Sequence, residues 1–221
     1  MPSSTPAAPT LIDVFERAAP TSMQVRVDAQ ASIYAIGDED DSMYLVEAGQ
    51  VKLAMSSAGG QESLLAIYTD GDIFGESCFS SADKRFESAS AMLPSTVRRV
   101  GRRDFLALVQ QMSAADALLR HVANRLAERQ TAVFDLVTMN AQRRLLKVLL
   151  QLAEKIGRTE GEHSVIEQRV SHEELSQIVG TTRPRITAFI SRFRELGLLD
   201  TTSARSIRIH RERTHSYLAR E

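Results

Sequence analysis

The chain has 221 residues, of which 43% are hydrophobic and 25% are charged, so it can bury one large core or two smaller ones. No apolar run approaches the roughly 18 residues of a membrane span, and the single cysteine, Cys78, excludes an intrachain disulfide and a four-thiolate metal site. The net charge of −1 hides an asymmetry, because residues 140–221 carry 15 basic and 10 acidic residues while residues 1–139 carry 12 and 18, which predicts a second domain that meets a polyanion.

The first segment begins with a stretch rich in Pro, Ser, Thr and Ala that shows no apolar periodicity. It has neither the basic segment nor the apolar core of a secretory signal peptide. We therefore expect residues 1–22 to form a mobile tail, and we expect a soluble protein located in the cytoplasm.

Short strands are predicted over residues 23–112. Their sequences are QVRV, SIYAI, SMYLVEAGQVKLAM, ESLLAIY and STVRRV, and polar segments such as GDEDD, SSAGGQ and TDGD separate them. In the longest of these runs, apolar residues alternate with polar neighbours on both sides of a predicted turn at Gly49-Gln50. The pattern is typical of an antiparallel sheet that curls into a β-roll or small barrel.

A long helix without Gly or Pro is predicted over residues 113–139. Positions at alternating steps of four and three residues are Ala115, Leu119, Val122, Leu126, Arg129, Val133, Leu136 and Asn140. A mostly apolar seam of this spacing suits a two-stranded coiled coil, and so a homodimer. One face of a helix packed on its own domain has the same spacing and remains the alternative.

Residues 140–221 predict a different architecture. The segment RRLLKVLLQLAEKIG predicts an amphipathic helix closed by Gly157, and EHSVIEQRV predicts a strand. Near the end, LGLLDTTSARSIRIHR predicts two short strands joined by a polar turn, which is the pattern of a wing.

Two consecutive helices are predicted between these elements. Ser171 and Glu174 have the spacing of a capping box, so the first helix begins at Ser171, and it ends at Gly180, a residue able to take positive φ. The second helix begins at Thr182, with Pro184 in its first turn, where no intrahelical amide donor is needed. A helix, a short turn containing Gly and a second helix form the bihelical DNA-binding motif.

The second of these helices has one apolar and one basic face. The apolar face comprises Ile186, Phe189, Ile190, Phe193 and Leu196, and the residues turned outward are Thr182, Arg183, Arg185, Ala188, Ser191 and Arg192. Arg183 and Arg185 lie at the end that enters the major groove, where an arginine can bind guanine O6 and N7, whereas Arg192 or Arg194 is better placed for phosphate. The alternative is a basic face that is merely solvated.

The segments YAIGDEDDSMYLVEAGQVKL, DGDIFGE and SHEELSQIVGTTRPRITAFISRFRELGLL, together with the long helix, resemble the cyclic-AMP receptor protein and FNR (Crp-Fnr) superfamily of bacterial transcription factors. The resemblance implies an α+β fold: an N-terminal β-roll like a cyclic-nucleotide-binding domain (23–112), a long dimerisation helix (113–139) and a C-terminal winged helix-turn-helix (140–221). It further implies a homodimer that reads a pseudo-palindrome in double-stranded DNA and acts with RNA polymerase. On this basis Ser171 and His172 join the expected DNA contacts.

The expected effector pocket departs from the pattern of the cyclic-AMP-binding relatives. In those relatives a Gly-Glu pair, whose Glu holds the ribose, is followed some ten residues later by an Arg that holds the phosphate. Here Gly75 and Glu76 match, but Glu87 occupies the position of that Arg, directly before Ser88. A carboxylate repels a cyclic phosphate, and Arg85 can substitute only if the strand slips or bends. Cyclic AMP is therefore not expected to be the effector.

The resemblance also assigns Arg129 and Gln130, on the long helix, to the effector pocket. Arg129 occupies a seam position, so a dimer would bring two guanidinium groups together and would need something to neutralise them. An ion pair with Glu87 is the neutraliser that we favour, and an anionic effector is the other. If a nucleotide effector exists, we expect cyclic di-GMP rather than cyclic AMP.

Other classes of function have less support. Glu76 and Glu87 suggest acid-base chemistry, but no nucleophile-base arrangement, metal-ligand spacing or phosphate loop accompanies them, so we predict no enzyme, no catalytic residue and no metal site. A cyclic-nucleotide sensor that does not bind DNA stays open as an alternative. We interpret Cys78 as a buried small hydrophobe rather than a redox sensor, and His121 as a solvated helix residue rather than a haem ligand.

Overall fold

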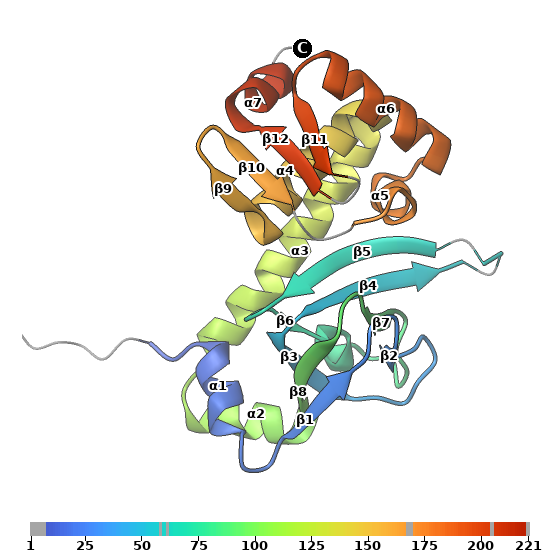
Figure 1. The fold of residues 1–221 in the computed structure, drawn as a ribbon. Helices are drawn as coiled ribbons and strands as arrows, with labels where there is room; N and C mark the ends of the chain where they lie inside the picture. The colour runs from blue at the N-terminus through green and yellow to red at the C-terminus, as the bar shows by residue number, and fades with distance from the viewer. Residues whose placement is uncertain (1–7, 58, 61, 167–169, 204–205, 220–221) are drawn as a thin grey trace, which may run out of the picture. The chain divides into compact units, whose positions relative to one another are not determined.

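The computed structural model describes residues 8–57, 59–60, 62–166, 170–203 and 206–219 (Figure 1). The chain divides into two compact units, and the division falls between Arg129 and Gln130, inside the long helix α3 (Ala115–Thr138). The first unit contains residues 1–61 and 65–129, and the second contains residues 62–64 and 130–221.

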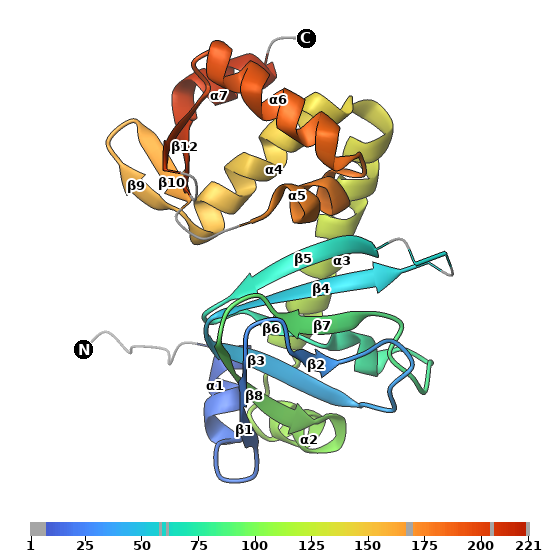
Figure 2. The same cartoon turned by 45° about the vertical axis from the view of Figure 1, so that its right-hand side comes forward.

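Two four-stranded sheets form the β-roll of the first unit, and Figure 2 shows them facing each other. One sheet has the order β1 (Met23–Val27), β8 (Ser95–Gly101), β3 (Ser42–Ala48) and β6 (Ile73–Phe74), and the other has the order β2 (Ser32–Tyr34), β7 (Ser88–Ala91), β4 (Gln50–Ser56) and β5 (Glu62–Thr69). The pairings of β8 with β1 and β3, and of β7 with β2 and β4, are antiparallel. The predicted β-roll is confirmed, although β6 and β7 were not recognised in the sequence.

The predicted turn at Gly49-Gln50 has a different role from the one that the sequence suggested. Strands β3 and β4 are consecutive in the chain but belong to different sheets, so the segment between them changes sheets instead of closing a hairpin. Gly49 has a φ of +102°, and a Cβ at this position would lie 2.4 Å from the Ser95 side chain. The sequence cannot distinguish a hairpin from a change of sheet here, because a strand pattern identifies strands but not their pairing partners.

Strand β3 separates two apolar cores. Tyr44 and Val46 point into the β-roll, where they pack with residues from both sheets. Met43 and Leu45 point to the opposite face and pack against helices. Burial on both faces explains why the strand is apolar at nearly every position, instead of alternating between an apolar and a polar face.

Two helices, α1 (Leu11–Arg17) and α2 (Arg102–Gln111), lie side by side on that outer face (Figure 1). The expectation of a mobile tail is wrong for residues 8–22, because α1 buries Leu11, Val14 and Phe15, and the Phe15 and Phe105 rings lie 5.5 Å apart. Residues 1–7 of the expected tail lie outside the described residues. The helix had two sequence signals: a Thr10–Asp13 capping box and apolar residues at helical spacing.

Helix α3 is an unusually exposed element. Over 24 residues it contains one buried residue, Asp135, while Leu119 is 71% exposed, Leu126 59% and Val133 62%. Its observed ends agree with the predicted helix to within two residues. The predicted seam is therefore solvent-exposed in the isolated chain.

The second unit joins four helices to a four-stranded sheet. The helices are α4 (Ala141–Ile156), α5 (His172–Val179), α6 (Arg183–Glu195) and α7 (Arg211–Ala219), and the sheet order is β11 (Leu199–Ser203), β12 (Ser206–His210), β10 (His163–Ile166) and β9 (Arg158–Glu160). Asn140 caps α4 by accepting from the Arg143 amide, and the apolar face of α4, which includes Leu145 and Leu149, is fully buried. Helix α7 and strand β9 were not predicted.

The winged helix-turn-helix is confirmed. The Ser171–Glu174 capping box begins α5, Gly180 ends it with a φ of +68°, and Pro184 lies in the first turn of α6. Strands β11 and β12 form the wing, and the turn at residues 204–205 lies outside the described residues. The predicted strand over residues 162–170 is shorter in the structure, and its residues 167–169 also lie outside the described part.

Candidate functional site

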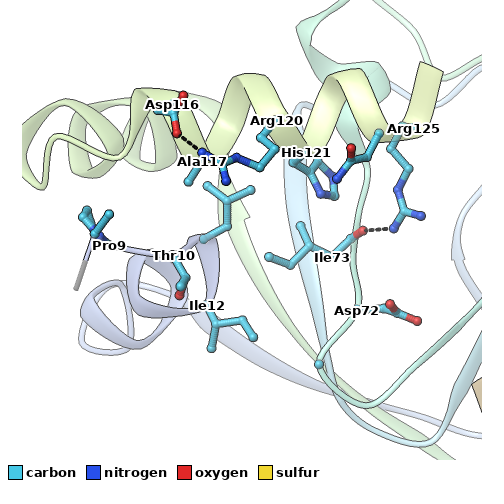
Figure 3. Close-up of a pocket in the computed structure, with 14 residues that line it drawn as sticks. Pro9, Thr10, Ile12, Asp72, Ile73, Asp116, Ala117, Arg120, His121 and Arg125 are labelled. Carbon is cyan, nitrogen blue, oxygen red and sulfur yellow. Dashed lines mark hydrogen bonds and ion pairs between the residues drawn. The ribbon is translucent and has the colours of Figure 1, made fainter. Parts of the chain in front are cut away.

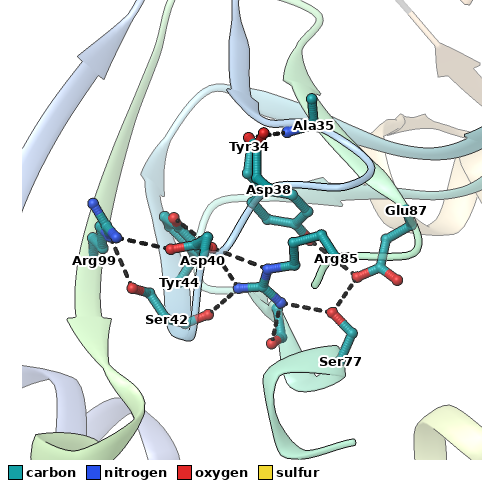
Figure 4. Close-up of polar contacts among 11 residues, drawn as sticks. Tyr34, Ala35, Asp38, Asp40, Ser42, Tyr44, Ser77, Arg85, Glu87 and Arg99 are labelled. Carbon is teal, nitrogen blue, oxygen red and sulfur yellow. Dashed lines mark hydrogen bonds and ion pairs between the residues drawn. The ribbon is translucent and has the colours of Figure 1, made fainter. Parts of the chain in front are cut away.

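Arg85 is the centre of a buried polar network at one end of the β-roll (Figure 4). Its side chain is 1% exposed, and all five N–H donors are used. Nε and Nη2 donate to Asp40 Oδ2 at 3.0 and 2.7 Å, Nη1 donates to the Gly75 carbonyl and to Ser77 Oγ at 2.8 and 2.6 Å, and Nη2 also donates to the Ser42 carbonyl. No donor of the Arg85 guanidinium remains for a further ligand.

Asp40 neutralises this arginine. Its Oδ2 also accepts from the Tyr44 hydroxyl at 3.1 Å, and its Oδ1 accepts from Arg99 Nη2 at 2.8 Å. Burial by itself would raise the pKa of Asp40, but the hydrogen bonds and positive charge of Arg85, helped by Arg99, outweigh burial and hold the pKa below its usual value. Asp40 and Arg85 are therefore a charged pair at neutral pH.

Glu87 lies in the same network, but no cation among the described residues forms an ion pair with it. Ser77 Oγ, which accepts from Arg85, donates to Glu87 Oε1, and the Tyr34 hydroxyl donates to the same oxygen at 3.4 Å. The Arg85 guanidinium stacks over the Tyr34 ring at 4.2 Å. Burial raises the pKa of Glu87, and it outweighs the opposing effects of Ser77 and Arg85.

Glu76 points to a different neighbourhood, the first half of α3. It lies in the short 3₁₀ helix η1 (Glu76–Phe79), with Oε1 at 3.6 Å from Arg125 Nε and Oε2 at 3.9 Å from His121 Nε2. Burial opposes ionisation of Glu76, but His121 and the charge of Arg125 outweigh it and lower the pKa. Arg125 also donates to the Ile73 carbonyl at 3.0 Å and lies 4.7 Å from the centre of the Tyr68 ring.

His121 and Arg125 also border a cavity of about 430 Å³ between α1, the segment before β6 and α3 (Figure 3). Thr10, Ile12, Ile73 and Arg120 are other lining residues, so the walls are mixed polar and apolar. The His121 side chain is only 15% exposed, because it turns toward Glu76. The expectation that His121 is solvated is therefore wrong.

Of the remaining predicted pocket residues, Gly75 belongs to this network through its carbonyl, and it adopts a φ of +96° before η1. Ser88 Oγ accepts from the Ile36 amide at 2.9 Å. Arg129 Nη1 donates to the Leu65 carbonyl at 2.6 Å, and Gln130 is exposed and falls in the second unit.

The favoured ion pair between Glu87 and Arg129 is not present among the described residues. Glu87 is held by Ser77 and Tyr34, whereas Arg129 is held by the Leu65 carbonyl. The sequence could not distinguish these outcomes, because carbonyl groups and hydroxyls compete for the same donors as carboxylates.

The basic surface of the second unit is exposed, in contrast to the buried network around Arg85. Ile186, Ile190 and Phe193 are buried and hold α6 to its unit, while Thr182, Arg183, Arg185, Ala188, Ser191 and Arg192 are exposed. Among the described residues, neither Arg183 nor Arg185 forms an ion pair, and the Arg185 guanidinium lies 5.6 Å from the Phe189 ring centre. Arg192 pairs with Glu195 at 2.9 Å, but both side chains are more than half exposed.

The start of α5 lies beside α6. Ser171 is exposed and accepts from the Glu174 amide at 3.1 Å, so its hydroxyl is part of the cap. His172 Nδ1 and Thr187 Oγ1 are 3.0 Å apart, which links the two helices. Partial burial and the nearby Arg183 and Arg194 lower the pKa of His172, so the ring is neutral at neutral pH.

Several residues of the buried network were missed in the sequence. Tyr34, Asp40 and Ser42 lie in the segment that carries the family resemblance, but none was assigned a role in a polar network, and Ser77 lies outside the quoted segments. The convergence of His121 and Arg125 on Glu76 had a signal, since residues four apart share a helix face. Cys78 is buried as expected, and burial raises its pKa to about 12.

Comparison with known proteins places this arrangement in a family. Residues 24–112 match the cyclic nucleotide-binding domain, and residues 143–214 match the Crp-like helix-turn-helix domain. The chain is 30% identical, over 75% of its own length and 75% of the relative's, to the CRP-like cAMP-activated global transcriptional regulator of Mycobacterium tuberculosis. The chain belongs to the Crp-Fnr superfamily of transcription regulators.

Solved structures share the fold of this chain. A mutant of CooA from Carboxydothermus hydrogenoformans matches with a TM-score of 0.79 at 21% identity, covering 96% of this chain and 97% of that one. The c-di-GMP responsive global regulator CLP of Xanthomonas campestris matches with a TM-score of 0.75 at 19% identity, covering 90% and 99%. These likenesses concern the fold. A search of the described helices found none long and apolar enough to cross a membrane.

Proposed function

We propose that this Crp-Fnr regulator is a homodimer that reads a pseudo-palindromic DNA operator through α6. The observation that carries the proposal is the exposure of Arg183 and Arg185 at the N-terminal end of a helix whose opposite face is buried. Arginines at this end of a recognition helix can donate to two acceptors of a guanine in the major groove. Arg192 and Arg194, further along the helix, are better placed for phosphates.

The DNA proposal is tested by selecting bound sequences from random DNA and measuring the salt dependence of affinity. We expect a palindrome whose half-site centres lie about 10 base pairs apart, with an affinity that falls steeply as salt rises. A chain that binds a cyclic nucleotide but shifts no DNA even in low salt would instead be the sensor module that does not bind DNA.

The dimer proposal is supported by the exposed apolar stripe on α3, which includes Leu119, Leu126 and Val133. Leaving such a stripe in water is unfavourable, and a second copy can cover it in coiled-coil fashion. Leu126→Glu should convert the dimer to a monomer in analytical ultracentrifugation without unfolding the chain. Ala127→Glu is the matched control, because one residue along the helix turns the same carboxylate by about 100°. Equal dissociation in both variants would count against this stripe.

We further propose that cyclic AMP does not bind the β-roll in the family's usual mode. Arg85 has no donor left for a phosphate, Glu87 presents a carboxylate, and Glu76 pairs with α3 instead of standing ready for a ribose. The residues present therefore do not fit a cyclic phosphate. The similar regulator of Mycobacterium tuberculosis is cAMP-activated, so the proposal separates this chain from that relative.

Calorimetric titration tests the effector proposal. We expect no heat of binding with cyclic AMP at concentrations up to about 1 mM, a level at which even a weak ligand is detected. A micromolar Kd that Glu76→Ala abolishes would contradict the proposal. Cyclic di-GMP is the second ligand to titrate, because a protein of similar fold responds to it, and we propose it ahead of cyclic AMP.

Membership of this family also suggests the setting in which the protein acts. We propose RNA polymerase as its partner at promoters and the bacterial cytoplasm as its location. Catalytic activity is not part of this proposal, since the family consists of transcription regulators.

A further inference from the structure

One guanidinium in the second unit connects the ends of two helices. Arg144, in the first turn of α4, donates from Nη1 to the Leu136 carbonyl at 3.3 Å and to the Met139 carbonyl at 2.5 Å, and from Nε to the Val179 carbonyl at 3.0 Å. Leu136 lies in the last turn of α3, and Met139 directly follows that helix, while Val179 is the last residue of α5. A cation is favourable at such ends, because the final carbonyls of a helix lack intrahelical donors.

Two further contacts join the same elements. Lys147, one turn beyond Arg144 on α4, forms an ion pair with Asp135, the single buried residue of α3. The Leu136 side chain lies against Gly180, since a Cβ at Gly180 would be 3.6 Å from Leu136 Cδ1. The last turn of α3 is thus attached to α4 by hydrogen bonds and an ion pair, and to the turn between α5 and α6 by packing and through Arg144.

The attached part of α3 carries part of its apolar stripe. Val133 and Leu136 belong to the second unit, together with α5 and α6. In a dimer formed along α3, the angle between the dimer axis and the recognition helix would therefore be fixed within this unit. The contacts between the last turn of α3 and its neighbours, rather than contacts to DNA, would determine the distance between the two α6 helices of the dimer.

We infer that Arg144 is a positioning residue that sets the half-site spacing of the operator. The inference rests on the proposed homodimer on DNA and adds the contact that fixes its geometry. Each base pair inserted between half-sites moves one of them by roughly 3.4 Å and turns it by roughly 35°, so a rigid dimer accepts one spacing and a loosened dimer accepts several. Spacing tolerance is a property that a purely stabilising residue would not change.

The experiment uses the full chain and the operator that the wild type selects, with base pairs inserted or deleted between the half-sites. Arg144→Lys keeps the charge but cannot reproduce a planar fork that reaches three carbonyls. We expect about a tenfold loss of affinity for the selected operator, because preorganisation is lost, and a much smaller further loss when the spacing changes by one base pair. Affinity for a single half-site should stay within about twofold of the wild type, since α6 itself is unaltered.

Arg143→Lys is the matched control. Arg143 is the neighbouring arginine on α4, but its Nη2 donates to the Leu218 carbonyl of α7, at 2.5 Å, and not to α3 or α5. This variant should keep the spacing preference of the wild type. Asp135→Asn weakens the ion pair with Lys147 and leaves Arg144 in place. It should also broaden the spacing preference.

Three results overturn the inference. A spacing profile of Arg144→Lys identical to that of Arg143→Lys would show that Arg144 does not set geometry. A loss at the single half-site as large as at the full operator would show that Arg144 only supports the helix-turn-helix fold, and a thermal unfolding curve checks this. If the wild type selects no palindrome, the proposed function fails as well, which distinguishes that failure from failure of the Arg144 variant alone.

Discussion

Arginines in the two units of this protein face opposite situations. Arg85 is buried in the β-roll, and every one of its five donors has a partner within the chain. Arg183 and Arg185 are exposed on α6 and form no ion pair among the described residues. The same side chain therefore holds a fold together in one unit and remains available for a ligand in the other.

The presence of an arginine does not by itself identify a binding site in this chain. In the β-roll, the presence of an arginine near the expected phosphate position suggests a substitute anion binder, but its bond to Asp40 makes it part of the framework. On α6, the acidic neighbours that would neutralise the first two arginines are absent from the helix sequence, since its only acid, Glu195, lies at the far end. An arginine indicates a binding site only when its N–H donors are not already used by partners within the chain.

Removing Arg85 should have the largest effect. Arg85→Gln leaves Asp40 with only the partly exposed Arg99 as its cation, and breaking a buried pair in this way costs about 3–5 kcal/mol. The measurement is the free energy of unfolding in urea. Tyrosine fluorescence reports the β-roll, because Tyr34, Tyr44 and Tyr68 lie in its core.

Arg99→Ala is the control for this comparison. Arg99 binds the same carboxylate, Asp40, but its side chain is 43% exposed, so its removal should cost less than about 1 kcal/mol. If the two variants were equally stable, the buried network would not be what distinguishes Arg85 from the other arginines.

Arg183→Ala should weaken DNA binding but leave stability almost unchanged, in contrast to Arg85→Gln. Its removal should weaken binding to the selected operator by about 1–3 kcal/mol and relax the preference at one base pair in each half-site. The free energy of unfolding should change by less than about 0.5 kcal/mol, because the side chain is exposed. Competition binding with operators altered at each position measures the first effect.

Arg194→Ala provides the control on the same helix. Arg194 is also exposed but lies near the C-terminal end of α6, so its loss should weaken all sequences alike and reduce the salt dependence. If Arg183→Ala lowered the affinity for operator and random DNA equally, Arg183 would be a phosphate contact and the base-reading assignment would be wrong.

The two units also differ in how far their sequences predict their structure. The helix-turn-helix was predictable because its signals are local: a capping box at Ser171, a glycine at Gly180 and a proline at Pro184 each specify the backbone within a few residues. The outward direction of Arg183 then follows from helical geometry alone. Short-range signals of this kind do not depend on the rest of the fold.

The β-roll was predictable only in outline. Strands were recognised, but the order of the sheets and the two buried faces of β3 depend on contacts far apart in the sequence. The bond between Asp40 and Arg85 joins residues 45 positions apart, so neither residue type nor spacing indicated it. Helix α1 was missed for a different reason. Its capping box is present in the sequence, but residues 1–22 were interpreted as one tail because the chain begins with a stretch rich in Pro, Ser, Thr and Ala.

Glu87→Gln should have the smallest effect of the three, and its sign is the informative quantity. Gln keeps an oxygen acceptor for Ser77 and Tyr34 but removes the buried negative charge. Because burial raises the pKa of Glu87, the folded chain holds the proton of Glu87 more tightly than the unfolded chain does. Ionising Glu87 therefore costs the folded wild type stability, and the variant avoids this cost.

The stability difference between the wild type and Glu87→Gln should depend on pH if it arises from the cost of ionising Glu87. Below the usual pKa of a glutamate, wild type and Glu87→Gln should be almost equally stable, since both are neutral at this position. As the pH rises through the raised pKa of Glu87, the wild type should lose stability relative to the variant, by less than about 1 kcal/mol, and the difference should then level off. Glu39→Gln, whose side chain is 80% exposed, controls for the loss of one negative charge from the same unit. A variant that is less stable than the wild type at neutral pH would contradict the prediction, because it would show that contacts to the Glu87 carboxylate outweigh the cost of burying it.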